Sequence, residues 1–127
     1  MNNRYFFSTL IVLLVTGLSL FPAQEFPEVD VQFADKWAHW IMYATMTVVI
    51  GIEQGLKKPV NAWGTRIAVI AVFAALWGAL MELCQAYLTT TRSGDFMDAA
   101  ANTFGALCGA LVLFLAYKTI PRLKDTE

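Results

Sequence analysis

The chain has 127 residues, of which 57% are apolar and 15% are charged, and its mean hydropathy is +0.54. This length excludes more than one domain, so residues 1–127 are treated as a single domain, and the composition is too apolar for an ordinary soluble protein. The net charge of −1 gives no indication of a nucleic-acid partner.

Four apolar segments approach the length of about 20 residues that a helix needs to cross a bilayer core about 30 Å thick. Only helices and closed barrels satisfy the backbone polar groups in lipid, and long continuous runs of Leu, Ala and Val are typical of helices. We therefore predict an all-α fold, an integral membrane four-helix bundle. The predicted helices cover residues 5–21, 36–52, 66–88 and 96–117.

The first segment also fits a signal peptide, with Arg4 as its basic start and residues 6–20 as its apolar core. However, bulky Phe21 stands where cleavage requires a small residue. We therefore expect this segment to be an uncleaved spanning helix.

Lys and Arg are unevenly distributed among the loops that separate these segments. Residues 22–35 contain four acidic residues and no Lys or Arg before Lys36, whereas residues 53–65 contain Lys57 and Lys58. Because Lys and Arg gather in cytoplasmic loops, we predict that both termini are cytoplasmic. This orientation puts seven of the nine basic residues inside and leaves Lys36 and Arg92 outside.

Polar side chains recur in the last three segments at helical spacing. At 1.5 Å per residue, with the predicted orientation, the side chains of His39, Glu82, Gln85, Asp98 and Asn102 lie within about 9 Å of the outer boundary. Residues three and four apart share one helix face, and charged groups in a bilayer are costly enough to suggest a function. The sets are Asp35, His39 and Tyr43; Glu82 and Gln85; and Asp98, Asn102, Gly105 and Gly109. The two glycines allow close helix contact, so we expect the last set to face the bundle interior.

Each polar residue also has a simpler structural interpretation. His39 alone would be a packing histidine, but beside Asp35 and facing Glu82 it is a candidate general base or proton relay. Glu82 is either half of an ion pair with Lys36 or Arg92, or an acid that contacts a ligand.

Arg92 is either an interface residue whose long side chain reaches toward water, or a bidentate ligand for a carboxylate or phosphate. Asp98 and Asn102 could merely join helices, but such hydrogen bonds average about 0.6 kcal/mol in membranes, too little to explain several ionisable groups in one layer. Lys36 is expected to end the second helix at the interface, and Gln85 to orient its neighbours.

A metal site is a weaker alternative. One histidine and several carboxylates could form a mixed site suited to Mg²⁺, Ca²⁺ or Mn²⁺. The nearby cations Lys36 and Arg92 argue against it, so we predict no metal. The chain has no glycine-rich phosphate loop, nucleophile elbow or cysteine cluster, and we predict no cofactor.

The arrangement of these residues resembles the VanZ-like family of small membrane proteins. The resemblance covers residues 35–109 and implies a multi-pass protein of the bacterial cytoplasmic (inner) membrane. The founding member is linked to low-level resistance to the lipoglycopeptide teicoplanin. The pair Gly94-Asp95 looks like loop variation, and no role is carried onto Asp95. The matching residues read Asp35-Lys36-x2-His39-x3-Tyr43, then Glu82-x2-Gln85-x6-Arg92-x5-Asp98-x3-Asn102-x2-Gly105-x3-Gly109.

The first functional hypothesis is a cell-envelope protein whose polar site at the outer leaflet binds a lipid, a lipid-linked molecule or a lipoglycopeptide, and which contributes to teicoplanin-type resistance. The alternative is an intramembrane hydrolase or transferase that uses Glu82, His39 and Asp98 on a lipid-linked substrate.

A transporter ranks lower because transporter sites usually lie near the membrane midplane. A bare scaffold leaves the buried charges unexplained, and the sequence leaves the oligomeric state open. The expected binding residues are Asp35, Lys36, His39, Glu82, Gln85, Arg92, Asp98 and Asn102.

Overall fold

The structure is a computed structural model that describes residues 5–20, 34–57, 63–88 and 96–119. Within these ranges all regular structure is helical, which confirms the prediction of an all-α chain with four helices. The helices are α1 (Phe6–Leu20), α2 (Ala34–Lys57), α3 (Trp63–Leu88) and α4 (Phe96–Thr119).

Two of the four helices are long and apolar enough to cross a membrane. They are residues Trp63–Tyr87 of α3 and Phe96–Thr119 of α4, judged by length and composition. α1 is apolar but has only 15 residues, and α2 has 24 residues but carries charged side chains near both ends. By length and composition, therefore, the third and fourth predicted membrane spans correspond to helices that could cross a membrane, α3 and α4.

The predicted boundaries of α2 and α3 are wrong at the connection between them. The sequence predicts a loop that includes residues 53–57 and 63–65, but these residues continue α2 and begin α3. The physical reason at the end of α2 is that Glu53 is buried against another helix, so this charged residue does not mark the end of the helix.

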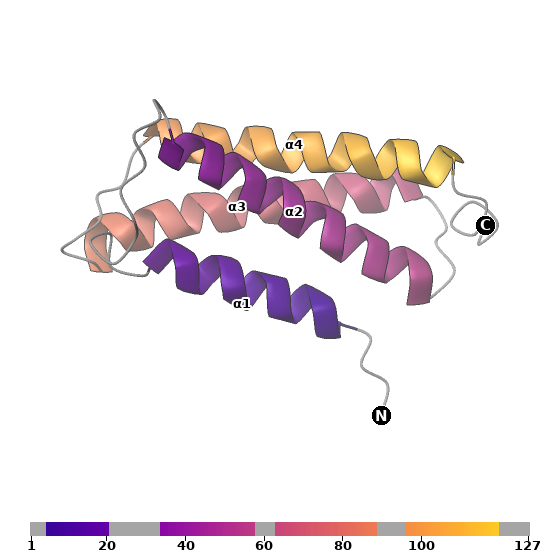
Figure 1. The fold of residues 1–127 in the computed structure, drawn as a ribbon, viewed down its shortest axis with the longest axis horizontal. Coiled ribbons are helices and arrows are strands. Elements are labelled where there is room, and N and C mark those ends of the chain that lie inside the picture. Colours follow the sequence, from indigo (N-terminus) through magenta and orange to yellow (C-terminus); the bar gives the residue numbers. More distant parts are fainter. Residues whose placement is uncertain (1–4, 21–33, 58–62, 89–95, 120–127) are drawn as a thin grey trace.

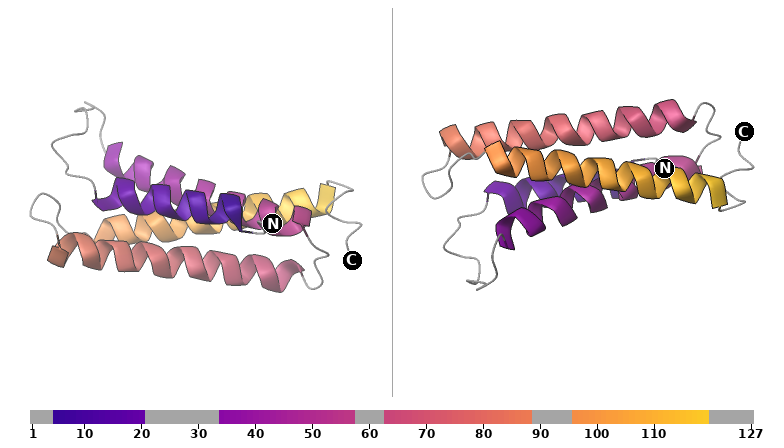
Figure 2. Two further views of the ribbon diagram at one scale, coloured as in Figure 1. Left: turned by 90° about the horizontal axis from the view of Figure 1, so that it is seen from below. Right: turned by 90° about the horizontal axis from the view of Figure 1, so that it is seen from above.

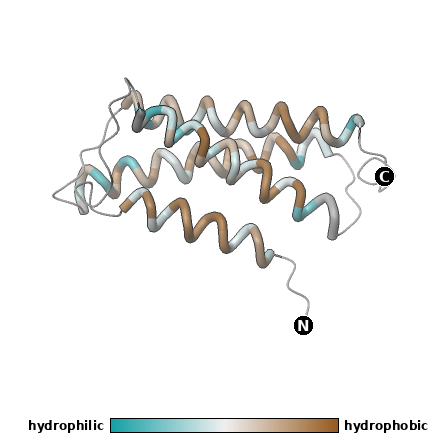
Figure 3. The backbone as a smooth tube through the Cα atoms, viewed as in Figure 1, coloured by the Kyte–Doolittle hydropathy of each residue, from teal (hydrophilic) through white to brown (hydrophobic). Residues whose placement is uncertain are grey.

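The helices alternate in direction, so that the first turn of α1 and the last turn of α4 lie at the same end of the bundle (Figures 1 and 2). α2 makes its most extensive contact with α4, while α1 packs against α2 and α3 and does not contact α4. Figure 3 shows that hydrophilic residues gather toward the two ends of the bundle. This arrangement brings the beginning of α2, the end of α3 and the beginning of α4 together.

α2 and α4 approach each other most closely at two glycines of α4. A Cβ atom on Gly105 would overlap the carbonyl oxygen of Trp40, and one on Gly109 would lie 2.7 Å from the carbonyl oxygen of Ala44. Only a residue without a side chain permits backbones to come this close. Asp98, Asn102 and both glycines are buried, which confirms that this face of α4 is turned inward.

The apolar core lies in two clusters along the bundle. The central cluster draws on all four helices, and the second joins α3 to α4 near the opposite end from the polar residues. Full burial of a Val, Leu, Ile or Met side chain in these clusters contributes roughly 1.5–3 kcal/mol when the reference is water. The central cluster contains Val15, Tyr43, Met46, Ala74 and Ala106, and the second contains Ile67, Leu113 and Tyr117.

The first turn of α1 is held by the carboxylate of Glu53. This carboxylate accepts hydrogen bonds from the backbone N–H of Phe7 at 2.7 Å, and from the N–H and hydroxyl of Ser8 at 2.9 and 2.6 Å. The first amides of a helix have no partner within the helix, and the helix dipole favours a negative charge there. Glu53 therefore fixes α1 to α2, a role that the sequence analysis did not assign.

Candidate functional site

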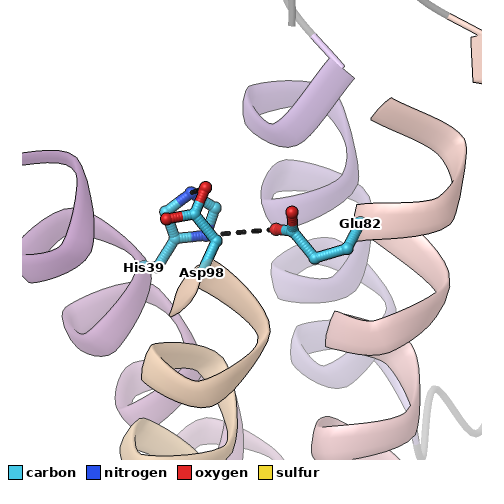
Figure 4. A group of neighbouring side chains, drawn as sticks. All are labelled: His39, Glu82 and Asp98. Atoms are coloured by element: carbon cyan, nitrogen blue, oxygen red, sulfur yellow. Dashed lines mark ion pairs between the residues drawn. The ribbon is translucent and has the colours of Figure 1, made fainter. Parts of the chain in front are cut away.

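Buried polar side chains from three helices meet near the end of the bundle where α2 and α4 begin and α3 ends. Figure 4 shows His39 of α2, Glu82 of α3 and Asp98 of α4 directed toward one another. His39, Glu82, Asp98 and Asn102 are each at most 7% exposed. Together with Lys36 they are called the polar cluster below. The predicted convergence of these five residues is thus present in the structure.

His39 and Asn102 form the hydrogen bond that joins α2 to α4 in this cluster. The distance between His39 Nδ1 and Asn102 Oδ1 is 2.9 Å, and Asn102 Nδ2 donates to the carbonyl oxygen of Gly78 on α3 at 3.4 Å. A carbonyl can only accept, so the amide of Asn102 must turn its oxygen toward His39. Consequently Nδ1 of His39 carries a hydrogen and donates it to Asn102, which holds the ring in this orientation.

Asp98 lies between Lys36 and His39. Its Oδ1 atom is 2.6 Å from Lys36 Nζ, and its Oδ2 atom is 3.7 Å from His39 Nε2. The first contact is a close ion pair between an ammonium group and a carboxylate, whereas the second is too long for a hydrogen bond. Asp98 is therefore anchored by the lysine through one oxygen and faces the histidine with the other.

Glu82 also approaches the ring of His39. Its Oε1 atom lies 4.0 Å from His39 Nδ1. Gly78, one turn earlier on α3, has no room for a Cβ because Asn102 Cβ would lie 2.8 Å from it. This close packing of α3 on α4 brings the carboxylate of Glu82 toward the ring of His39.

Gln85 and Tyr43 have neighbours on α1. Gln85 Nε2 donates to the carbonyl oxygen of Ser19 at 2.7 Å, so this amide ties the end of α3 to the end of α1. Tyr43 is fully buried, and its hydroxyl has Ser19 and Glu82 among its polar neighbours. Both residues support the packing around the polar cluster, and Tyr43 is part of the central apolar core.

Two predicted site residues are not placed by the structure. Arg92 lies outside the described residues, as does the pair Gly94-Asp95. Asp35 lies in the first turn of α2, but its side chain is not described. Their predicted roles stay predictions.

A groove of about 500 Å³ lies toward the opposite end of the bundle, between α1, α2 and α3. Its walls are mainly apolar and include Val12, Ile50, Val69 and Phe73, with Gln54 among the polar contributors. None of the lining residues belongs to the polar cluster, so this groove is not an entrance to it. The sequence analysis did not predict the groove, because the shape of a surface between helices is not encoded in hydropathy.

The polar cluster combines two carboxylates, one ammonium group and one imidazole. One ligand atom each from His39, Glu82 and Asp98 lies within 4.8 Å of the others. Buried charges are tolerated only when other charges or hydrogen bonds compensate them, so each member depends on its neighbours. The same groups offer proton donors and acceptors, and contacts for a charged ligand.

Comparisons of the chain with protein-family models, with curated proteins and with solved structures each give no match. The resemblance to the VanZ-like family therefore rests on the spacing of the residues named in the sequence analysis.

Proposed function

We propose that the chain is a VanZ-like, multi-pass protein of the bacterial cytoplasmic membrane. In this proposal the polar cluster binds the charged head group of a lipid, a lipid-linked molecule or a lipoglycopeptide at the outer leaflet. The observation that carries the proposal is the convergence of Lys36, Glu82 and Asp98 with His39 at one end of an otherwise apolar bundle.

The membrane part of the proposal is supported by the surface of the helices. Leu76 and Val69 of α3 are 65% and 62% exposed, and Phe104 of α4 is 59% exposed. Soluble monomers rarely expose many large apolar side chains, whereas lipid covers them at no cost. With both termini in the cytoplasm, the polar cluster is at the outer end of the bundle, since α2 and α4 begin there.

Head-group binding is supported by the position of Lys36 at the rim of the cluster. Its side chain is 22% exposed, against 10% for the side chain of its partner Asp98. A phosphate can replace the carboxylate beside the ammonium group, and an amine on the same ligand can then pair with Asp98. The ion pair between Lys36 and Asp98 would then be replaced by two contacts, one from each residue to the ligand. Such a pair can bind a head group that carries both a negative and a positive charge.

The proposal is tested by expressing the chain in a teicoplanin-susceptible bacterial host and measuring the minimal inhibitory concentration. The wild-type protein should raise it, and the isosteric variants Glu82→Gln and Asp98→Asn should remove the increase. Leu83→Ala is the matched control, because Leu83 follows Glu82 but is 57% exposed. Membrane fractions must contain equal amounts of each protein. Equal resistance in all variants, or no effect of the wild-type chain, would overturn the proposal.

The alternative function, an intramembrane hydrolase or transferase, is favoured by the position of His39 beside two carboxylates. Nδ1 is held by Asn102, which leaves Nε2, 3.7 Å from Asp98, as the nitrogen that can exchange a proton, and Glu82 lies within 4.0 Å of the same ring. An enzyme produces a new compound, so lipid extracts from cells with and without the protein should differ. Full activity of a His39→Ala protein would remove His39 as the base.

A further inference from the structure

We propose that His39, Glu82 and Asp98 form a binding site for one divalent transition-metal ion, for which Zn²⁺ is the probe. This goes beyond head-group binding and does not rest on it, because a metal can bind whether or not the chain affects teicoplanin. It also reverses the prediction from the sequence that the nearby cations exclude a metal.

The first step is the direction in which the free lone pair of His39 points. Asn102 accepts the proton on Nδ1, so in the neutral imidazole Nε2 carries a lone pair. That lone pair is turned toward Asp98 Oδ2 at 3.7 Å, and both atoms are then acceptors. Two acceptors that face each other in a buried site are compensated either by a proton on Nε2 or by a metal ion between them. A metal-ligating histidine typically donates its other N–H to an oxygen, as His39 does to Asn102.

The second step is the distance between the donor atoms. Zinc lies about 2.0–2.2 Å from histidine nitrogen and carboxylate oxygen, so two tetrahedral ligands are about 3.4 Å apart. The observed 3.7 Å between His39 Nε2 and Asp98 Oδ2 is close to this value. Glu82 supplies the third donor, and the whole set lies within 4.8 Å. Coordination by all three residues therefore needs a contraction of up to about 1.4 Å, with a water in the fourth position.

The third step concerns Lys36, which appeared to oppose a metal. Its ammonium group contacts Oδ1 of Asp98 and leaves Oδ2 directed toward His39. The lysine thereby orients the carboxylate instead of occupying the position of the metal. Glu82, Asp98 and Lys36 together carry a net charge of −1 when the imidazole is neutral, so the cluster attracts a divalent cation.

The experiment measures zinc binding by the purified full-length protein in detergent, carrying an affinity tag without histidine. His39 is the single histidine of the chain, so it can be tested without interference from others. The two cysteines, Cys84 and Cys108, are replaced by serine in every protein because thiolates bind zinc. After treatment with a chelator, isothermal titration should show one zinc ion per chain.

Four variants define the site. His39→Gln and Glu82→Gln should abolish specific binding, and Asn102→Leu should weaken it about 10- to 100-fold, as expected for a residue that orients a ligand. Glu53→Gln is the matched control, because Glu53 is an equally buried carboxylate at the other end of α2. Circular dichroism checks that each variant retains its helices.

The proposal is overturned if the parent protein binds no zinc, or if His39→Gln binds it as tightly as the parent. X-ray absorption of the zinc-loaded parent protein is a second test, and it does not depend on whether any variant folds. Nitrogen and oxygen ligands at about 2.0–2.2 Å are expected, together with the outer-shell scattering of one imidazole ring, and a spectrum without imidazole scattering overturns the site. Zinc binding with no effect on resistance would sink the head-group proposal alone, and the reverse result would sink the metal site alone.

Discussion

His39 on α2 and Asn102 on α4 are joined by a hydrogen bond of 2.9 Å in the interior of the bundle, although 63 residues separate them in the chain. Asn102 also donates to the Gly78 carbonyl oxygen, so a single amide links α2, α3 and α4. This amide sets both the separation of the three helices and the orientation of the imidazole. The polar cluster and the helix packing therefore depend on each other.

The Asn102→Leu variant should be less stable by about 1–3 kcal/mol, because it leaves the Nδ1–H group of His39 buried without its acceptor. Thr103→Ala is the control: its hydroxyl bonds only to the Ala99 carbonyl of the same helix and is exposed. Thermal unfolding of the purified proteins in one detergent measures the difference. Equal melting temperatures for both variants would show that the amide does not hold the helices together.

The ion pair between Lys36 and Asp98 should show strong coupling in a double-mutant cycle. Lys36→Met leaves a nearly buried carboxylate without its cation, and should destabilise the protein by about 1–3 kcal/mol. Lys36→Met combined with Asp98→Asn should recover part of this loss, because the uncompensated charge is gone. Strictly additive effects on the unfolding free energy would contradict a direct pair.

The close contact of α2 and α4 predicts that added methyl groups on α4 disrupt the bundle. Gly105→Ala would place a Cβ against the carbonyl oxygen of Trp40, which belongs to the backbone and cannot rotate away. We expect a loss of about 1–3 kcal/mol, typical of overpacking. Gly17→Ala is the control, since nothing lies within 4 Å of its Cβ position, and helix propensity favours alanine by about 0.5–1 kcal/mol. Thermal unfolding in detergent separates the two, and a tolerated Gly105→Ala would contradict this packing.

The convergence of His39, Glu82 and Asp98 could be predicted because it depends on two simple rules. Helical periodicity puts polar residues on one face, and alternating helix directions put three helix ends at one level. The hydrogen-bond partners could not be predicted, since the Asn102 contact depends on how closely Gly78 and Gly105 allow the helices to approach.

The role of Glu53 was missed for a different reason. Its charge was interpreted as a sign of a loop, although it lies fourteen residues after His39, or close to four helical turns, and so on the same face. Continuing that periodicity past Ile52 would have indicated that Glu53 is buried. Nothing in the sequence, however, names the first turn of α1 as its partner.

Glu53→Ala should release the first turn of α1. The variant removes the acceptor of the Phe7 and Ser8 amides, which costs about 1–2 kcal/mol by analogy with the loss of a helix cap. Hydrogen exchange should therefore speed up in the first turn of α1 and stay unchanged in α4, which α1 does not contact. Glu53→Gln keeps an acceptor oxygen and should show a smaller increase. Uniform acceleration over all four helices would indicate general destabilisation instead.

The proposed orientation predicts the location of fused reporter proteins. An even number of spans puts Phe6 and Thr119 on the same side, and the excess of Lys and Arg at that end predicts the cytoplasm. Green fluorescent protein fused after residue 127 should fluoresce, whereas alkaline phosphatase should be inactive there. Alkaline phosphatase inserted between α3 and α4 should be active, because that connection is then outside.

The reversed pattern would put the polar cluster at the inner leaflet and exclude an outer-leaflet head group as its ligand. The zinc site would be unaffected, because its donor atoms are held by the helices and not by the side of the membrane they face.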